Sequence, residues 1–369
     1  MSSAHILNGL GEINPNWLSR ILSAQADIGE CQVLDMTRQD LNQDAGFVSQ
    51  IIRVRMHYGD RPKGAPASVI VKLAPKDPHT RELGKLLGLF QREVAFYKNF
   101  AEGNPCNPPR AYFSEIADSG DSFTIVLEDL GNVDAETLLD GCTVAEAHSV
   151  LATLGTLHAK YWRGRNLDGH DWIPTVATMK PALIAMASTA VPGFLKRFDE
   201  QIPDALRAGI NLAWEIYSEL IDEAAKEPNQ TLCHTDCHVG NFVFQDGGPR
   251  FFDWQAYMLQ SYAADVAYFL NGNLVTAARR KHLDVLLDGY YAALCAGGVG
   301  DISRQDVTDD YHRQTAGQLV LIPLISGAFL SHDEKGALLA ETWLPRYFAA
   351  MEDSNAPEEL ATWLAEART

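Results

Sequence analysis

The sequence predicts an α+β protein in two parts, a strand-rich N-terminal part and a mostly helical C-terminal part. Three observations support this prediction. Short β-branched or alternating segments dominate residues 31–130. After Gly131, apolar residues recur mostly at steps of three and four. The length of 369 residues exceeds one ordinary domain. We therefore expect an N-terminal lobe over 1–130 and a C-terminal lobe over 131–369.

The elements of the first part follow from local pattern. A short helix is expected over 14–24. The β-branched segment SVIVKL at 68–73 predicts a buried strand, and AYFSEI at 111–116 and SFTIVLEDL at 122–130 predict two more. Residues 82–100 return to helical spacing before NPCNPPR breaks it. These segments together predict a sheet with at least one covering helix.

The second part is expected to be helical with one exception. Thr143 and Glu146 form a capping box that predicts the start of a helix. The further helices that we expect span 179–200, 203–226, 262–296, 302–330 and 333–367. Within 232–255, the apolar runs NFVF and RFFDW flank QDGGP, which predicts a β-hairpin.

Composition excludes several classes of protein. The chain carries 30 Lys and Arg against 48 Asp and Glu, a net charge of −18, which argues against a nucleic-acid partner. Its 46% hydrophobic content argues against bulk disorder. The six cysteines show no CxxC spacing, so no disulfide framework is expected. The start lacks a signal-peptide pattern, and no apolar run reaches the roughly 20 residues of a membrane span. We expect a cytoplasmic protein.

The segment His234–Asn241 carries the most informative motif. Asp236 is followed by Asn241 and then, after the expected hairpin, by Asp253. Phosphoryl transfer from a nucleotide needs a carboxylate that orients the attacking hydroxyl, and oxygen ligands that hold magnesium on the phosphates. This spacing therefore predicts Asp236 as the base and Asn241 and Asp253 as metal ligands.

A lysine in a buried strand predicts the nucleotide site. Lys72 lies inside VIVKL, where an unpaired charge is costly, so it must be paired or point to water from an edge strand. Glu93, on the expected helix, is the preferred partner, because Glu82 lies too near the helix start. A strand lysine paired with a helix glutamate holds nucleotide phosphates in kinases.

The boundary segment after the last predicted strand offers a third element. An extended stretch at Glu128, Asp129 and Leu130 can present backbone N–H and C=O groups to the edge of an adenine. An ordinary strand end explains the same residues equally well.

Taken together, these motifs resemble the aminoglycoside/choline phosphotransferase superfamily, which has a bilobal protein-kinase-like fold. DWQ at 253–255, VLEDL at 126–130 and LHAKYW at 157–162 resemble its ecdysteroid-kinase-like branch. The resemblance covers roughly residues 30–350 and implies a kinase that uses ATP and Mg²⁺ to phosphorylate a hydroxyl of a small-molecule alcohol. The apolar residues of 179–217 favour a mainly apolar alcohol over a polycationic aminoglycoside.

The resemblance also implies roles for single residues. Lys72 would contact the α- and β-phosphates, and Glu128 to Leu130 would form the hinge to adenine. His234 would orient the loop that carries Asp236, Asp265 would brace that loop, and His238 would make a structural hydrogen bond. The phosphate loop over 44–50 has only one glycine, Gly46, so contacts from Gly46 and Ser49 follow only from its position.

Two alternatives belong to other functional classes. His234, Asp236 and His238 form HxDxH, a spacing that zinc hydrolases use. A non-catalytic nucleotide- or ligand-binding module on the same fold is the other alternative. The joint presence of the five polar residues that the kinase needs favours an active enzyme; they are Lys72, Glu93, Asp236, Asn241 and Asp253.

Overall fold

The computed structural model describes the chain except for residues 1–4, 42–48, 132–138, 246, 331–332 and 368–369. It divides into two compact units. Unit 1 comprises Met1–Asn132 together with Phe252–Gln255, and unit 2 comprises Val133–Phe251 together with Ala256–Thr369. The short segment Phe252–Gln255 thus belongs to the unit that contains the N-terminal sheet, although its neighbours along the chain belong to the other unit.

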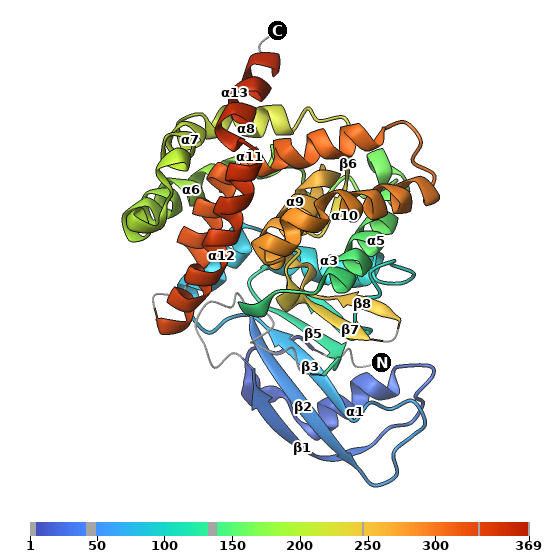
Figure 1. Cartoon of the computed structure of the whole chain (residues 1–369). Helices are drawn as coiled ribbons and strands as arrows, with labels where there is room; N and C mark the ends of the chain where they lie inside the picture. Colours follow the sequence, from blue (N-terminus) through green and yellow to red (C-terminus); the bar gives the residue numbers. More distant parts are fainter. Residues whose placement is uncertain (1–4, 42–48, 132–138, 246, 331–332, 368–369) are drawn as a thin grey trace. The chain divides into compact units, whose positions relative to one another are not determined.

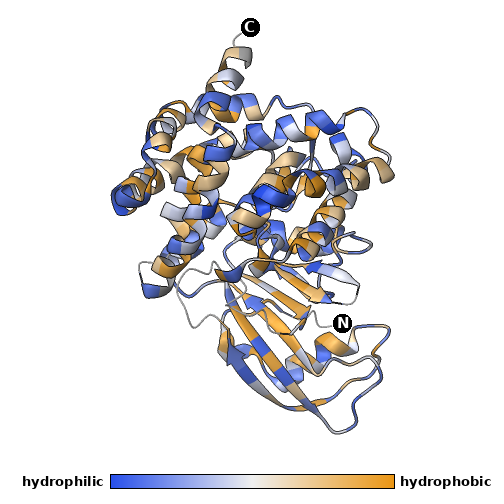
Figure 2. Cartoon of the chain, viewed as in Figure 1, coloured by the Kyte–Doolittle hydropathy of each residue, from blue (hydrophilic) through white to orange (hydrophobic). Residues whose placement is uncertain are grey.

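Unit 1 is built on a five-stranded antiparallel sheet with the order β1-β2-β3-β5-β4. Figure 2 shows hydrophobic and hydrophilic residues alternating along β2, whereas the central strands β3 and β5 carry continuous apolar runs and are largely buried. The bounds are β1 Val33–Asp40, β2 Gln50–Tyr58, β3 Ser68–Leu73, β4 Ala111–Ile116 and β5 Phe123–Glu128. The strands predicted at 68–73 and 111–116 are confirmed. The strand predicted at 122–130 is β5, which ends at Glu128, two residues earlier than predicted.

The opening helix covers one face of this sheet. Helix α1 spans Pro15–Ser23, and the side chain of Asn14 caps it by accepting a hydrogen bond from the Trp17 N–H. Its apolar side, including Trp17 and Leu22, is buried in one cluster with Val54 and Val126 of the sheet. The helix predicted over 14–24 is therefore confirmed, and the face of the sheet that it covers carries a hydrophobic core of unit 1.

The single helix expected over 82–100 is wrong, because two helices occupy this region. Helix α2 spans Pro78–Leu86 and helix α3 spans Leu89–Asn99. Gly88 separates them with φ +67, a left-handed conformation that glycine adopts without steric cost and that ends the helical path.

Unit 2 is mostly helical (Figure 1). Its helices are α5 Val144–Lys160, α6 Val176–Arg197, α7 Asp204–Glu215, α8 Tyr217–Ala224, α9 Tyr262–Asn273, α10 Thr276–Ala296, α11 Arg304–Phe329, α12 Glu334–Asp353 and α13 Ala356–Ala367. Along both units, short 3₁₀ turns occupy Leu10–Glu12, Trp162–Gly164, Asp199–Gln201, Val239–Asn241 and Trp254–Ala256. The predicted capping box is present, with Thr143 and Glu146 bonding each other's backbone N–H groups.

Three expected long helices are each broken in two. The break in 203–226 falls at Ile216, and that in 262–296 falls after Asn273. The break in 333–367 has a local cause: Asn355 takes φ +45, and Pro357 then lies in the first turn of α13. Among the described helices, none combines the length and apolar character needed to cross a bilayer.

Two small antiparallel pairs frame the segment 234–241. Strand β6 (Gln230–Cys233) pairs with β9 (Met258–Ser261). Strand β7 (Phe242–Gln245) pairs with β8 (Gly248–Phe251), which confirms the predicted hairpin. Because β6 ends and β7 begins beside the motif, both ends of the loop that contains Asp236 are fixed in a sheet.

Candidate active site

A buried charged cluster lies in unit 1. The Lys72 ammonium Nζ lies 2.6 Å from Glu93 Oε1 and 3.1 Å from Asp253 Oδ1. Lys72 is 4% exposed and Glu93 is 1% exposed, so the alternative of an edge-strand lysine in water does not hold. Glu82 is exposed on α2, and Glu93 on α3 is the partner.

The charges in this cluster do not cancel. Burial alone disfavours the Lys72 ammonium, but the neighbouring Asp253 and Glu93 carboxylates more than compensate and raise its pKa above the usual value. Burial raises the pKa of Glu93, and Lys72 opposes that rise. One ammonium therefore faces two carboxylates, and Asp253 is the more exposed of the two, with 19% of its side chain accessible. Such an excess of negative charge suits a divalent cation at Asp253.

An aromatic stack fixes Asp253 beside Lys72. Trp254 is fully buried, and its ring stacks on Phe96 of α3 at a centroid distance of 4.0 Å and an interplanar angle of 7°. Phe96 lies three residues after Glu93, so both project from a similar side of α3. Sequence reasoning missed this contact. The tryptophan of DWQ was the available signal, because a large aromatic beside a metal-ligand candidate needs somewhere to pack.

The segment after β5 is held to the sheet by side chains. The Asp129 carboxylate pairs with the Arg53 guanidinium at 2.8 Å and accepts a hydrogen bond from the Ser68 hydroxyl at 2.6 Å. Arg53 also donates to the Gly131 carbonyl. Burial opposes ionisation of Asp129, yet the bonds from Ser68 and Arg53 outweigh it and lower its pKa. Arg53 was missed, although a buried arginine in the strand QIIRVRM raises the same question as Lys72.

In unit 2, Asp236 lies within a hydrogen-bonded loop. The Asn241 amide Nδ2 donates to Asp236 Oδ2 at 3.0 Å and to the Asp236 carbonyl at 2.9 Å. His238 Nδ1 accepts from the Gly240 N–H, which leaves its Nε2–H directed at Asp236 Oδ1, 3.5 Å away. Burial raises the pKa of Asp236, but His238, His234 and Asn241 together bring it down to about 2. Asp236 is thus ionised, and its side chain is 31% exposed.

Asp265 braces the same loop from the first turn of α9. Its fully buried carboxylate accepts from the His234 N–H at 2.7 Å and from the Thr235 N–H at 2.8 Å. It also lies 3.3 Å from His158 Nε2. Thr235 takes φ +70, which is unfavourable for a β-branched residue and is maintained by these bonds. The predicted contact of Asp265 with the loop is confirmed.

The remaining predicted residues are placed as follows. His234 is buried, and its Nδ1 accepts from the Asp236 N–H at 3.3 Å, within the loop that it was expected to orient. Ser49 is buried immediately before β2, and Gly46 lies outside the described residues. Glu128 ends β5, and Leu130 is half-buried two residues later.

The zinc alternative gains nothing from the geometry. Within the described ranges, the His, Cys, Asp and Glu side chains that converge as metal ligands would are His158, Cys233 and Asp265, not the HxDxH set. His158 lies within hydrogen-bond distance of Tyr290 and Asp265, and the Cys233 thiol contacts backbone carbonyls of β9. These groups are therefore already satisfied by the protein.

Comparisons with known proteins identify the family and the fold of this chain. The model of the ecdysteroid kinase-like family matches residues 43–297. Among solved structures, choline kinase from Cryptosporidium parvum Iowa II is 12% identical with a TM-score of 0.55, and the alignment covers 98% of this chain and 97% of that one. Amicoumacin kinase hAmiN, solved in complex with AMP-PNP, Ca²⁺ and Ami, is 14% identical with a TM-score of 0.51, and the alignment covers 85% of this chain and 88% of that one.

A microcompartment-associated aminopropanol kinase is 11% identical with a TM-score of 0.50 and coverages of 95% and 98%. Among curated proteins, no sequence matches significantly. Likeness at such low identity shows the fold, whereas the family model matches well over half of the chain. This chain is a member of the ecdysteroid kinase-like family, and its α+β protein-kinase-like fold is the one that it shares with choline kinase and other small-molecule kinases.

Proposed function

We propose that this protein is a small-molecule kinase that transfers the γ-phosphoryl group of ATP to a hydroxyl of a small-molecule alcohol, with Mg²⁺ as cofactor. The observation that supports it most is the buried cluster in which Lys72 meets both Glu93 and Asp253. A buried lysine shared by two carboxylates is costly unless it serves a purpose, and binding of nucleotide phosphates is the purpose that the family suggests.

In this proposal, unit 1 binds the nucleotide. The Lys72 ammonium contacts the α- and β-phosphates, and Glu93 keeps it oriented. The Glu128 carbonyl and the Leu130 N–H contact the adenine edge, while Gly46 and Ser49 belong to the loop over the phosphates. Asp129 acts differently from its neighbours, because its side chain is engaged with Arg53 and Ser68. It fixes the backbone that contacts adenine.

Asn241 and Asp253 are the proposed ligands of Mg²⁺, which would neutralise charge on the phosphates when bound. Their donor chemistry fits a hard cation. Asp253 Oδ1 is the oxygen that contacts Lys72, so Oδ2 is the oxygen proposed to bind the metal. The Asn241 amide nitrogen is directed at Asp236, so its amide oxygen faces away from that bond. Oxygen is the ligand atom in both cases.

Asp236 is the proposed base. It accepts a hydrogen bond from the substrate hydroxyl and directs a lone pair of that oxygen at the γ-phosphorus. As the new O–P bond forms and the bond to the β-phosphate oxygen breaks, the hydroxyl proton passes to the carboxylate and ADP leaves. A pKa of about 2 keeps Asp236 ionised and makes it a weak base, which fits proton transfer late in the reaction.

We further propose that the acceptor is a mainly apolar alcohol. Phe194 and Phe198 of the segment 179–217 are buried among the helices and carry no information on substrate. The support comes from Met179, Met186 and Trp214, which remain partly exposed.

The test separates the two aspartates. Calorimetric titration of ATP with and without Mg²⁺ should show that Asp236→Asn retains metal-dependent binding, while its ADP production falls by about 10²–10⁴. Asp253→Asn should lose both turnover and the metal dependence of binding, because a neutral amide is a poorer metal ligand. Asp284→Asn, at a site whose side chain is 92% exposed, is the matched control.

Four outcomes would contradict the proposal. Retained metal dependence in Asp253→Asn with its loss in Asp236→Asn would reverse the roles. Parent protein that binds no ATP, or full turnover in both variants, would end the kinase assignment. Greater ADP production with kanamycin-like aminoglycosides than with apolar alcohols would end the substrate assignment.

A further inference from the structure

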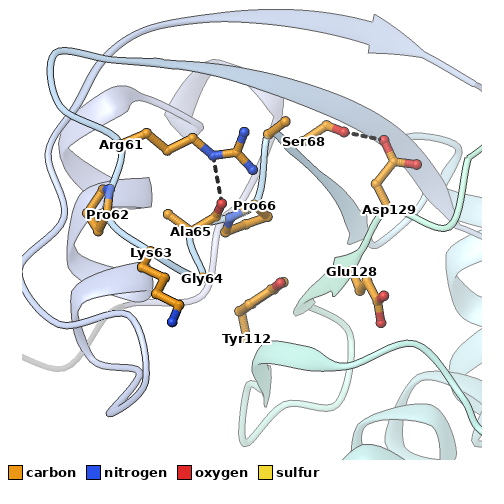
Figure 3. Close-up of a pocket in the computed structure, with 11 residues that line it drawn as sticks. Arg61, Pro62, Lys63, Gly64, Ala65, Pro66, Ser68, Tyr112, Glu128 and Asp129 are labelled. Carbon is orange, nitrogen blue, oxygen red and sulfur yellow. Dashed lines mark hydrogen bonds between the residues drawn. The ribbon is translucent and has the colours of Figure 1, made fainter.

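Unit 1 contains a pocket, with a volume of about 640 Å³, between the β2–β3 loop and the ends of β4 and β5 (Figure 3). The pocket is lined by basic, apolar and acidic residues: Arg61, Pro62, Lys63, Tyr112, Glu128 and Asp129, with the small residues of the loop between them. It is therefore a mixed site in which one loop supplies the cations and the strands supply the other wall.

This pocket is distinct from the Lys72 cluster. Lys72 pairs in register with Ile125, so their side chains share one face of the sheet. Side chains alternate along β5, which places Val126 and Glu128 on the opposite face. Val126 is buried in the cluster with α1, which identifies that face. The Glu128 side chain thus reaches the pocket from the α1 side, whereas Lys72 lies on the other.

Apart from Asp129, which pairs with Arg53, the side chains that line the pocket carry an excess of positive charge. Arg61 donates Nε to the Ala65 carbonyl at 2.8 Å, and neither Arg61 nor Lys63 forms an ion pair within the part of the chain that the structure describes. Of the two carboxylates of the pocket, Asp129 is neutralised by Arg53, whereas Glu128 accepts from the neutral backbone N–H of Arg110 at 3.1 Å and keeps its negative charge. In a protein of net charge −18, two unpaired cations at one cavity are notable.

The rest of the wall suits an apolar or aromatic body. Tyr112 is half-buried, and the Arg110 guanidinium lies 5.0 Å from its ring centroid. Pro62 and Pro66 line the loop side (Figure 3). We propose that this pocket binds a small organic anion, a carboxylate or phosphate on an apolar or aromatic scaffold. The anionic group contacts Arg61 and Lys63, and the scaffold lies against Tyr112 and the prolines.

Binding in this pocket has a consequence for the nucleotide site. Glu128 and Asp129 line the pocket, and their backbone continues into Leu130, the proposed adenine contact. A ligand that shifts this segment changes nucleotide affinity, and by reciprocity the nucleotide changes the affinity of the ligand. This second step rests on the proposed function, whereas binding of the anion does not.

The test uses phenyl phosphate and phenylacetate as anionic probes and benzyl alcohol as the neutral one. Each is titrated by calorimetry into the full chain, alone and with saturating AMP-PNP and Mg²⁺. We expect saturable binding of at least one anion, also in the presence of AMP-PNP. The double variant Arg61→Gln/Lys63→Gln should weaken binding of the anion by about 10-fold or more, because two charge-assisted contacts to the anion are lost. Lys63→Gln alone removes no hydrogen bond that shapes the loop and should give an intermediate loss.

The matched control is Arg20→Gln/Lys85→Gln, which removes the same charge from exposed positions of unit 1 outside the pocket and should bind like the parent. Preference for either anion supports the proposal and identifies the head group. No saturable binding, equal binding of benzyl alcohol, equal losses in both double variants, or an apparent Kd that keeps rising in proportion to the AMP-PNP concentration, as in competition for one site, would overturn the proposal. Parent protein that fails to bind AMP-PNP would instead defeat the proposed function and leave this test intact.

Discussion

Replacing Asp265 with asparagine tests how much the buried brace contributes to the Asp236 loop. The carboxylate accepts the Thr235 N–H on Oδ1, and the His234 N–H and the His158 Nε2 contact on Oδ2. An asparagine keeps the shape but turns one of these two oxygens into an NH₂ donor. In either orientation of the amide, its NH₂ group faces a backbone N–H, and the hydrogen bond that this N–H donated to the carboxylate is lost.

The magnitude follows from these bonds. With the NH₂ in place of Oδ2, His158 can change tautomer and accept from it, but the His234 N–H loses its acceptor. With the NH₂ in place of Oδ1, the Thr235 N–H loses its acceptor. One buried unsatisfied N–H costs about 1–3 kcal/mol, and the bonds that remain lose their ionic reinforcement. We expect Asp265→Asn to lower the free energy of unfolding by about 2–4 kcal/mol.

Chemical denaturation at neutral pH measures this difference, with Asp284→Asn as the control. Burial opposes ionisation of Asp265, but the bonds from His158 and the loop outweigh it and depress its pKa. A carboxyl group whose pKa is depressed in the folded state stabilises the fold at pH values above its pKa in the unfolded chain, about 3.9. This stabilisation is lost as the pH falls from that value towards the folded-state pKa. The gap between parent and variant should therefore narrow below about pH 4. A difference of less than about 0.5 kcal/mol in the free energy of unfolding at neutral pH would refute the proposed role of Asp265 in stabilising the loop.

Turnover adds a second measurement. Because Asp265 acts through Thr235 and His234 rather than on substrate, the variant should lower kcat while the KM for ATP changes little. If the KM for ATP rises and kcat holds, the brace supports nucleotide binding instead.

Local pattern predicted much of the fold. Strands 68–73 and 111–116 and the Thr143 capping box depend on neighbours within a few residues, which the sequence displays directly. The β6–β9 pair was missed because each strand has only four residues and its partner lies beyond a loop and a hairpin. The helix breaks were missed because hydrophobic spacing continues across them, whereas Gly88 and Asn355 change the backbone direction.

In the candidate site, too, residues that belong to a sequence motif were predicted, whereas residues that support them from distant parts of the sequence were not. Motif spacing identified Lys72 and Glu93, and their buried ion pair is present in the structure. The residues that hold such groups in place were not visible, because Arg53 meets Asp129 and Phe96 meets Trp254 across long stretches of sequence. These supporting contacts carry no short motif. A buried cation in a strand and a tryptophan beside an acid are the signals that can be used in other chains.

Three further predictions concern charge and packing. Lys72→Met should weaken ATP binding and cost about 3–5 kcal/mol in unfolding free energy, because it leaves the buried Glu93 and the partly buried Asp253 without a counter-charge; adding Glu93→Gln should recover part of that loss. Burial raises the pKa of Glu227 to about 7, so parent stability should fall relative to Glu227→Gln as pH rises from about 4.5 to 7, measured by thermal unfolding; an unchanged difference would contradict that pKa. Gly327 and Gly317, both on α11, should respond oppositely to alanine. A Cβ at Gly327 would collide with the Ala190 carbonyl of α6, where rigid backbone cannot yield, so Gly327→Ala should destabilise by more than about 2 kcal/mol. A Cβ at Gly317 meets nothing within 4 Å, so Gly317→Ala should stabilise by about 0.5–1 kcal/mol through helix propensity, and equal effects of the two would refute the close approach of α6 and α11.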